Sequence, residues 1–309
     1  MASLPRSPRR RPPIPWHLAV FLGPAVLLYS AFMVFPLLDS LRLSMLAPDG
    51  GFAGLENYQR LLTDGNLAPR FWGAVQNNLV FFGIHMLVQN PIGLLLAVLL
   101  STRVLRGRAV YRTLIFAPTV LSVVIIGFIW KLILSPLWGV AEGGLDAIGL
   151  GSLFEPWLGL QGSALITVSL MSVWQFVGIP MLLFSAALLA IPDEIIEAAR
   201  VDGAGPLRIF SRIQLPMIAP TVGIVAILTF VGNFNAFDLV YSVQGGLAGP
   251  EFSTDLLGTL FYRTFFGFQL QSGSPTLGAT VAGMMFLMIL FGVCLFLFGV
   301  QRRLVRYEA

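Results

Sequence analysis

The segment EAARVDGAGPLRIFSRIQLP, residues 197–216, is the most polar long stretch in the second half of the chain, and it lies between two apolar runs of membrane length. Asp193, just before it, supplies a carboxylate suited to the amino end of a helix. Gly203 falls where the carboxyl cap of a helix favours a left-handed residue, and Pro206 can open a second short helix that ends before Pro216. The segment therefore predicts a hairpin of two short helices that is too polar to enter a membrane.

The composition places this hairpin in an integral membrane protein. Of the 309 residues, 56% are hydrophobic and 11% are charged, so a water-soluble fold would lack polar surface to cover its core. A helix needs about 20 apolar residues to span a bilayer. Runs of this length occupy residues 17–38, 79–100, 114–134, 164–190, 217–241 and 277–300. We therefore expect an all-α membrane protein with six transmembrane helices.

Basic residues orient these six runs. Fourteen of the 19 Lys and Arg residues lie in the two tails and in the loops after the second and fourth runs, all on one side of a six-span bundle. The positive-inside rule places this side, with both termini, in the cytoplasm. We expect a basic tail at 1–16, a six-helix domain at 17–303 that includes the hairpin loop 191–216, and a second tail at 304–309. The positive charge reflects topology and contact with membrane lipid, so we expect no nucleic-acid partner.

Polar and aromatic side chains interrupt the fourth and fifth runs. They are Trp174, Gln175 and Phe176 in the fourth run and Phe234, Asn235 and Asp238 in the fifth. If the fifth run is one continuous helix, its spacings of three and four residues place these side chains on one face. Such a surface suits an uncharged polyhydroxylated solute, whose hydroxyls need partners while its C–H faces pack on aromatic rings. Hydrogen bonds between helices would use the same residues, so both interpretations stay open.

A proline interrupts the second run, where Gln89 and Asn90 precede Pro91. Proline removes a backbone donor and frees a carbonyl, and nearby amides can satisfy such a group. The pattern therefore favours a structural kink at this point.

The chain offers few groups for catalysis. Its only histidines, His17 and His85, lie in no cluster of Cys, His and carboxylate residues at metal-ligand spacing. Its single lysine, Lys131, is not part of a Gly-Lys-Ser/Thr phosphate-binding motif. We therefore expect no enzyme activity, no metal and no cofactor, and any ATP would be bound by a partner subunit. The alternatives are a stand-alone carrier that uses Asp238 as a proton or sodium site, without the internal repeat typical of carriers, and a membrane hydrolase that uses His85.

The hairpin has the composition of a docking surface. Its alanines and glycines allow close approach of a partner, and its alternating acidic and basic residues give that contact a charge pattern. The alternative is a helix that lies on the lipid surface. Physical chemistry favours docking only slightly.

The same segment resembles the EAA loop of ABC importer permeases. The matching positions are Glu197-Ala198-Ala199, Asp202-Gly203-Ala204, Ile213, Leu215 and Pro216. Four further stretches, GLENYQRLL, RGRAVYRTLIFAPTVLS, FDLVYSVQGG and FYRTFF, follow an order similar to that of the carbohydrate-type permeases of the maltose and glycerol-phosphate class.

This resemblance implies a type I importer permease in the bacterial inner membrane. It would form a heterodimer with a second permease, dock its loop on a dimer of cytoplasmic ATPase subunits, and receive a carbohydrate-like solute from an extracytoplasmic binding protein. The coupling residues that the resemblance implies are Glu197, Ala198, Ala199, Asp202 and Gly203.

The resemblance also implies a substrate path. A Phe-Asn-x-Phe stretch that contacts sugar in the maltose member is matched by Phe234-Asn235-Ala236-Phe237, and further contacts follow a Trp that is matched by Trp174. Gln175 and Phe176 depart from the family at this second place, which leaves the identity of the solute open. The implied path residues are Trp174, Gln175, Phe176, Phe234, Asn235 and Asp238.

Overall fold

The computed structural model describes residues 16–101, 106–269 and 271–301. The predicted basic tail 1–16, apart from its last residue, and the predicted tail 304–309 lie outside the described residues. Within the described ranges the chain is mostly helical, as the apolar runs predict. The one small sheet pairs β1 (Gly267–Phe268) with β2 (Gln271–Ser272) in antiparallel register, with Gly267 opposite Ser272.

The first half of the chain contains the helical elements that precede α9. They are α1 (Trp16–Tyr29), the π-helix η1 (Ser30–Val34), α2 (Phe35–Leu43), α3 (Glu56–Thr63), α4 (Leu67–Ile84), the π-helix η2 (His85–Gln89), α5 (Asn90–Ser101), α6 (Arg108–Val120), α7 (Val123–Ile133), α8 (Val140–Ala147) and the 3-10 turn η3 (Gly151–Leu153).

The second half contains the hairpin and the last apolar helices. Its elements are α9 (Gln161–Phe176), α10 (Gly178–Leu189), α11 (Asp193–Val201), α12 (Pro206–Ile209), the π-helix η4 (Phe210–Gln214), α13 (Leu215–Met217), α14 (Ala219–Phe234), α15 (Asp238–Gln244), the 3-10 turn η5 (Pro250–Phe252), α16 (Leu257–Phe266), α17 (Pro275–Leu295) and the π-helix η6 (Phe296–Gln301).

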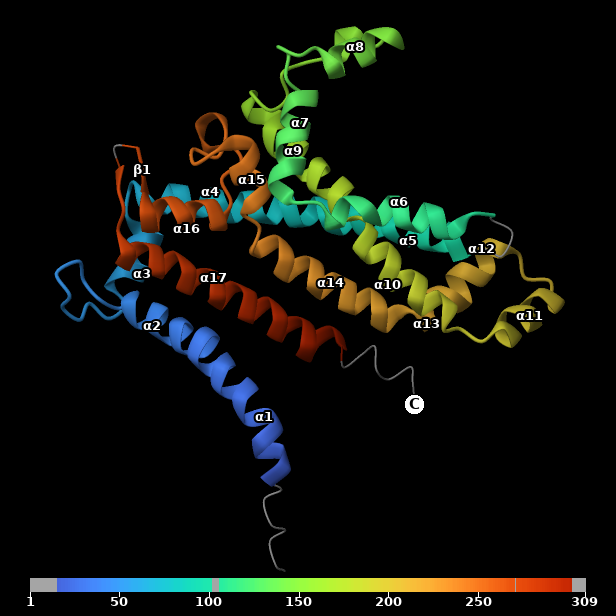
Figure 1. Cartoon of the computed structure of the whole chain (residues 1–309), viewed down its shortest axis with the longest axis horizontal. Helices are drawn as coiled ribbons and strands as arrows, with labels where there is room; N and C mark the ends of the chain where they lie inside the picture. Colours follow the sequence, from blue (N-terminus) through green and yellow to red (C-terminus); the bar gives the residue numbers. More distant parts are fainter. Residues whose placement is uncertain (1–15, 102–105, 270, 302–309) are drawn as a thin grey trace, which may run out of the picture.

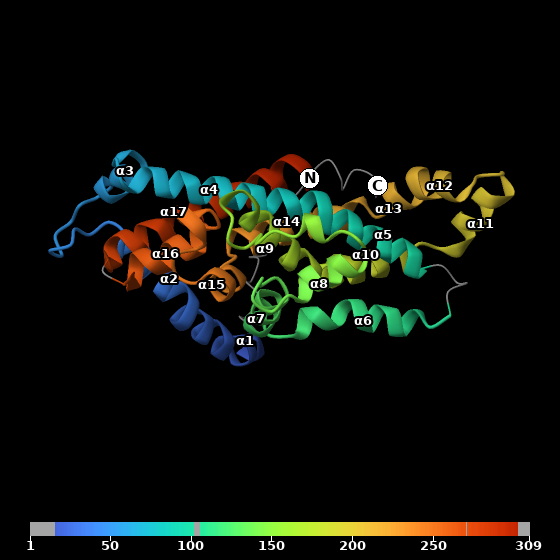
Figure 2. The same cartoon turned by 90° about the horizontal axis from the view of Figure 1, so that it is seen from above.

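The helices form an elongated bundle (Figures 1 and 2). Strands β1 and β2 lie at one end with α3 and α16, and we call this the strand end. Helices α11 and α12 lie at the opposite end, which we call the hairpin end. Helices α1 and α2 form an arm that contacts the bundle where α2 meets α17 and then projects away from it, and α7 and α8 stand away from the long axis of the bundle (Figure 1).

Six segments can cross a membrane when each bent helix pair is counted as one span. Three are single segments, Val20–Leu43, Leu67–Ser101 and Pro275–Gly299, and three are bent pairs, α6 with α7, α9 with α10, and α12–α13 with α14. Each of these six segments contains most of one predicted run. The number and order of the spans therefore agree with the hydropathy pattern.

The third, fourth and fifth runs are bent or broken, which the hydropathy pattern does not indicate. The third run bends by 97° between α6 and α7, at an extended pair, Leu121 and Ser122, that follows Pro118. Proline lacks a backbone donor and disfavours continuation of the helix around it. The fifth run leaves the helix after Phe234 and resumes it at Asp238. Phe234, Asn235 and Asp238 therefore do not share one helical face, because that face requires an unbroken helix.

The second run also differs in detail from the predicted kink. A π-helical turn, η2, precedes Pro91, and Leu67–Ser101 remains one continuous span. Asn90 donates to Met86 Sδ at 3.2 Å and to Thr229 Oγ1 at 3.1 Å, not to a freed backbone carbonyl. The extra residue of a π-turn widens the helix locally, and such turns are frequent at functional sites.

A glycine brings the second and fourth spans into close contact. A Cβ atom at Gly93 of α5 would lie 2.8 Å from Pro180 Cγ of α10 and 3.1 Å from the backbone nitrogen of Met181. Small residues let membrane helices approach closely and gain van der Waals contact. This contact matters because the hydrophobic effect does not drive helices together within lipid. Helices α5 and α10 therefore form a fixed pair beside the hairpin end.

A buried ion pair fixes the strand end. Arg263 of α16 donates to Asp255 at 2.5 Å and to the Gly246 carbonyl at 3.1 Å, and the hydroxyl of Thr259 donates to the same carboxylate at 2.7 Å. Both charged side chains are buried. A buried pair satisfied in this way holds its loop in one arrangement, since breaking it would leave an unpaired charge.

Candidate functional site

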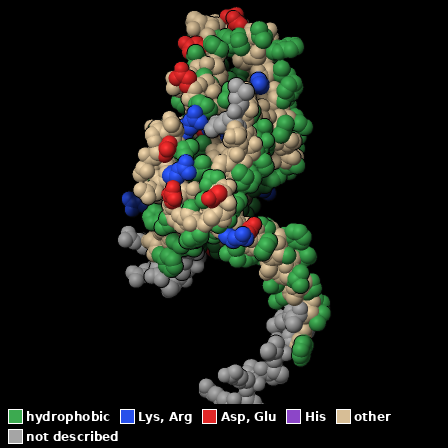
Figure 3. All heavy atoms as spheres, turned by 90° about the vertical axis from the view of Figure 1, so that its left-hand side faces the viewer, with side chains coloured by type: hydrophobic (Ala, Val, Ile, Leu, Met, Phe, Trp, Pro, Cys, Tyr) green, Lys and Arg blue, Asp and Glu red, His purple; other side chains and the backbone are tan. Residues whose placement is uncertain are grey.

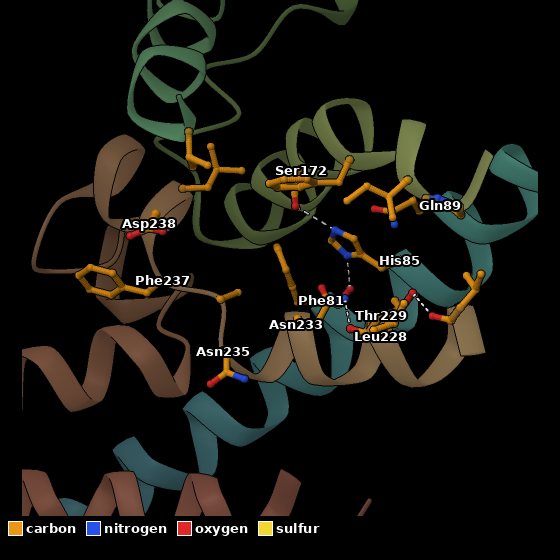
Figure 4. A pocket seen from close by; sticks show the side chains of 18 of the residues that line it. Phe81, His85, Gln89, Ser172, Leu228, Thr229, Asn233, Asn235, Phe237 and Asp238 are labelled. Atoms are coloured by element: carbon orange, nitrogen blue, oxygen red, sulfur yellow. Dashed lines mark hydrogen bonds between the residues drawn. The ribbon is translucent and has the colours of Figure 1, made fainter. Parts of the chain in front are cut away.

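A pocket of about 340 Å³ opens in the middle of the bundle. Its walls come from α4, η2, the start of α7, α9, α10, α14 and α15 and from the non-helical link between the last two (Figure 4). Most of its lining is apolar. The polar lining residues are His85, Gln89, Ser172, Thr229, Asn233, Asn235 and Asp238.

The break in the fifth run shapes one end of this pocket. Asn235, Phe237 and Asp238 line it where the chain passes from α14 to α15. The amide of Asn235 donates to the Val231 carbonyl at 2.9 Å, and the ring of Phe237 stacks on Tyr241 with centroids 5.0 Å apart. Backbone outside helices is tolerated at membrane depth where it lines a cavity. The break therefore presents aromatic and polar groups to the pocket.

His85 and Ser172 join two walls between the ends of the pocket. The Nδ1 atom of His85 lies 2.8 Å from the Phe81 carbonyl, and its Nε2 atom lies 2.9 Å from Ser172 Oγ (Figure 4). A carbonyl can only accept, so Nδ1 carries the hydrogen. In the neutral ring Nε2 then accepts a hydrogen bond from the serine hydroxyl. Because the Ser172 hydroxyl donates to His85, the lone pairs of Ser172 Oγ stay available to accept hydrogen bonds.

Half of the predicted path residues line the pocket. Phe176, Asn235 and Asp238 belong to its lining. Trp174 instead packs edge-to-face against Trp130, with centroids 5.6 Å apart. Phe234 lies in a buried cluster whose rings include Phe82 and Phe230.

Gln175 has a structural contact at the break between α6 and α7. Its Nε2 donates to the Leu121 carbonyl at 3.3 Å, and its own backbone carbonyl accepts from Thr119 Oγ1 at 2.9 Å. Gln175 is fully buried. It therefore satisfies a carbonyl that the break exposes and ties α6 to α9.

The sequence-based site prediction missed several pocket residues. His85 was considered only for hydrolysis and Gln89 only for a kink, while Ser172, Thr229 and Asn233 were not selected. A signal was present, because Phe81, His85 and Gln89 are spaced four apart, as are Thr229 and Asn233. Spacing of four places side chains on one helical face.

The hairpin has the predicted turn, but the prediction that its second helix ends before Pro216 is wrong, because α12, η4 and α13 run on without a gap from Pro206 to Met217. Helix α11 ends at Val201, and Gly203 follows its cap residue Asp202 with φ +75°. The Gly203 and Ala204 nitrogens donate to the Arg200 and Ala199 carbonyls at 3.0 and 2.9 Å, the two bonds of a Schellman cap. Pro206 opens α12. The turn is therefore rigid although it is polar and exposed.

The predicted coupling residues lie on the outer surface of this hairpin. Glu197, Ala198, Asp202 and Gly203 are exposed, and Ala199 is buried beneath them. A Cβ atom at Gly203 would meet nothing within 4 Å. A partner can therefore approach the turn closely from outside.

Residues 89–306 match the family described as binding-protein-dependent transport system inner membrane component. The chain belongs to this family. The lactose transport system permease protein LacF of Rhizobium radiobacter is 34% identical over 275 residues, which cover 87% of this chain and 89% of that protein. The probable ABC transporter permease protein YurN of Bacillus subtilis is 34% identical over 253 residues, which cover 80% of this chain and 84% of that protein.

A solved structure has the same fold. It is a bacterial ABC transporter involved in the import of the acidic polysaccharide alginate, in which one chain matches with a TM-score of 0.76 and 24% identity, covering 92% of this chain and 96% of that chain. The resemblance drawn from the hairpin and the type I importer permease fold are thus confirmed. The permease is a multi-pass membrane component of a binding-protein-dependent importer, and nothing supports the alternative of a stand-alone carrier.

Proposed function

We propose that the permease forms half of the path by which an ATP-driven importer moves a sugar or polyol across the bacterial inner membrane. The observation that carries this proposal is the central pocket, which combines aromatic rings with amide and hydroxyl groups. Its volume of about 340 Å³ is large enough for a small solute. The names of relatives support the same solute class, since LacF is a lactose transport system permease protein and MsmF of Streptococcus mutans is a multiple sugar-binding transport system permease protein.

The six predicted path residues divide into two roles in this proposal. Phe176, Asn235 and Asp238, which line the pocket, contact the solute. Trp174, Gln175 and Phe234 stand behind the lining and hold the walls in place. A buried second layer of this kind keeps contact residues in a fixed geometry.

A second permease completes the path, and the projecting arm supports this. Exposed rings on the arm include Phe21 at 79% and Phe32 at 73%. No residue of the Val20–Leu43 span is buried within the chain. Figure 3 shows the arm covered by hydrophobic side chains below the body of the molecule. Since the arm packs on little of its own chain, it is free to pack on a related subunit within the membrane.

The hairpin docks on a dimer of cytoplasmic ATPase subunits in this proposal. The exposed Glu197, Ala198, Asp202 and Gly203, with Ala199 beneath them, provide the contact. The sequence contains no phosphate-binding motif, so ATP is bound by the partner, and an extracytoplasmic binding protein delivers solute at the strand end. This orientation places both termini in the cytoplasm, in agreement with the distribution of Lys and Arg.

Transport then follows from two states of the permease pair. ATP binding draws the two ATPase subunits together, and the rigid hairpins transmit this displacement to the spans. The pocket is exposed alternately to each side, and its affinity for solute differs between the two states.

Co-purification tests the proposal. A tagged copy expressed in its native host and extracted in mild detergent is expected to carry a second permease and an ATPase, both identified by mass spectrometry. Glu197→Lys reverses an exposed charge on the hairpin and is expected to reduce recovery of the ATPase while the second permease remains. Recovery of the chain alone, under conditions that preserve a known importer, would contradict the proposal.

A further inference from the structure

Three polar side chains extend from the middle of the pocket to the end opposite Asp238. We call them the inner wall: Ser172, His85 and Gln89. Figure 4 shows Gln89 and Asp238 at opposite ends of the pocket, with His85 and Ser172 between them. All three side chains are more than nine-tenths buried, with exposed fractions of 4%, 3% and 6%. None of the six path residues implied by the family resemblance lies on this wall.

Gln89 carries an unmatched polar atom. Its Oε1 is buried and has no hydrogen-bond partner within the described residues, although the residue lines the pocket. An unsatisfied buried acceptor is costly, and native proteins retain such groups where a ligand or water completes them. Gln89 also ends the π-helical turn η2, a kind of element that is frequent at functional sites.

The inner wall offers two hydrogen-bond acceptors, beside the amide N–H2 group of Gln89. Ser172 gives its hydrogen to His85 Nε2, so its oxygen has lone pairs available, and Gln89 adds an amide oxygen. These two acceptors favour a solute that brings O–H donors.

The charge at the opposite end of the pocket disfavours anionic solutes. Asp238 is the one charged residue among those that line the pocket within the described chain, and no Lys or Arg is found there. A lone carboxylate at the mouth of a low-dielectric cavity repels anions.

We propose that the inner wall binds the hydroxyl groups of an uncharged sugar or polyol, and that Asp238 at the opposite end of the same pocket excludes anionic sugars. This inference rests on the proposed function and adds to it a solute charge class and a second binding region. Gln89 and Ser172 accept hydrogen bonds from solute hydroxyls, and His85 fixes the direction of the serine hydroxyl.

Thiol labelling tests the inference without knowledge of the natural solute. The sequence has a single cysteine, Cys294, so Cys294→Ser gives a cysteine-free permease. Into this background we place Gln89→Cys, Asn235→Cys at the Asp238 end, and Leu87→Cys as the matched control. Leu87 lies on the same π-turn but is 79% exposed on the outside of the chain. Membranes that contain the full complex are treated with hydroxyethyl methanethiosulfonate, which is neutral, and with sulfonatoethyl methanethiosulfonate, which is anionic.

We expect the neutral reagent to modify Gln89→Cys about tenfold faster than Leu87→Cys, because the thiolate that reacts needs a wet, polar surrounding. Each reagent's labelling rate is first divided by its rate on a free thiol. After this correction we expect the anionic reagent to label Gln89→Cys about tenfold more slowly than the neutral reagent. When Asp238→Asn is added, we expect this difference to fall to about threefold or less.

Three results would overturn the inference. The first is a labelling rate at Gln89→Cys no higher than at Leu87→Cys, whether or not Asn235→Cys reacts. The second is that the two reagents label Gln89→Cys at equal rates relative to their rates on a free thiol. The third is a preference for the neutral reagent that Asp238→Asn leaves unchanged. The proposed function is judged separately in the same membranes by recovery of the ATPase with the tagged permease. Loss of that recovery would contradict the importer assembly whatever the labelling pattern.

Discussion

Gly203 is the residue whose backbone is most closely tied to the proposed coupling role. Its φ of +75° is a conformation that L side chains rarely adopt, and among them Asn and Asp tolerate it best. Because a side chain at this position meets nothing within 4 Å, it would project outward from the turn toward a docked partner.

Gly203→Asp is expected to abolish transport although the chain still inserts into the membrane. The new carboxylate lies at the carboxyl end of α11, where negative charge is unfavourable, and it occupies the docking surface. Gly203→Asn is the matched control, since it has the same size without the charge, and we expect it to retain a larger share of transport. Solute uptake and the amount of permease in the membrane are measured together. Normal transport by Gly203→Asp would show that the turn is not the docking surface.

Two single residues show which features the sequence can predict and which it cannot. The left-handed cap at Gly203 follows from local chemistry, so it could be predicted and is confirmed. The contact of Gln175 with the Leu121 carbonyl joins residues 54 positions apart. Only the folded arrangement of α6 and α9 brings these groups together, and sequence spacing carries no sign of it.

At the scale of the helix, Gly93 and Gly83 lie on the same span but in different surroundings. A Cβ atom at Gly93 would overlap Pro180, whereas one at Gly83 would meet nothing within 4 Å. We expect Gly93→Ala to destabilise the permease by about 1–3 kcal/mol, the usual cost of overpacking. Gly83→Ala is expected to be neutral or to stabilise it by up to about 1 kcal/mol, because alanine has the higher helix propensity.

Thermal unfolding of the two purified variants in detergent measures this difference. A lower midpoint for Gly93→Ala alone supports close packing of α5 on α10. Equal midpoints would mean that the two helices can separate without cost at this point.

Helix number and helix shape differ in how well the sequence predicts them. Hydropathy reports how long the chain stays apolar, so it locates six spans. It does not report direction, because the residues on both sides of a bend are equally apolar. For this reason the 97° bend between α6 and α7 and the break after Phe234 were not predicted. Since that break forms one end of the pocket, the pocket could not be predicted in full either.

At the scale of the whole molecule, the two ends of the bundle and its arm face different partners. The hairpin end is polar and rigid, the pocket lies between the ends, and the α1–α2 arm is apolar and projects from the body (Figures 1 and 3). An exposed apolar arm can pack on lipid or on protein, and the proposed heterodimer requires the second.

Photo-crosslinking separates these two cases. A benzoylphenylalanine in place of Phe32, which is 73% exposed on the arm, is expected to capture the second permease. The same group in place of Leu207, 78% exposed on the hairpin, is expected to capture the ATPase, and it serves as the control for reactivity in the same complex. The crosslinked bands are identified by mass spectrometry. If Phe32 captured only lipid while Leu207 captured the ATPase, the arm would face the bilayer, and the second permease would have to contact the pocket side of the bundle instead.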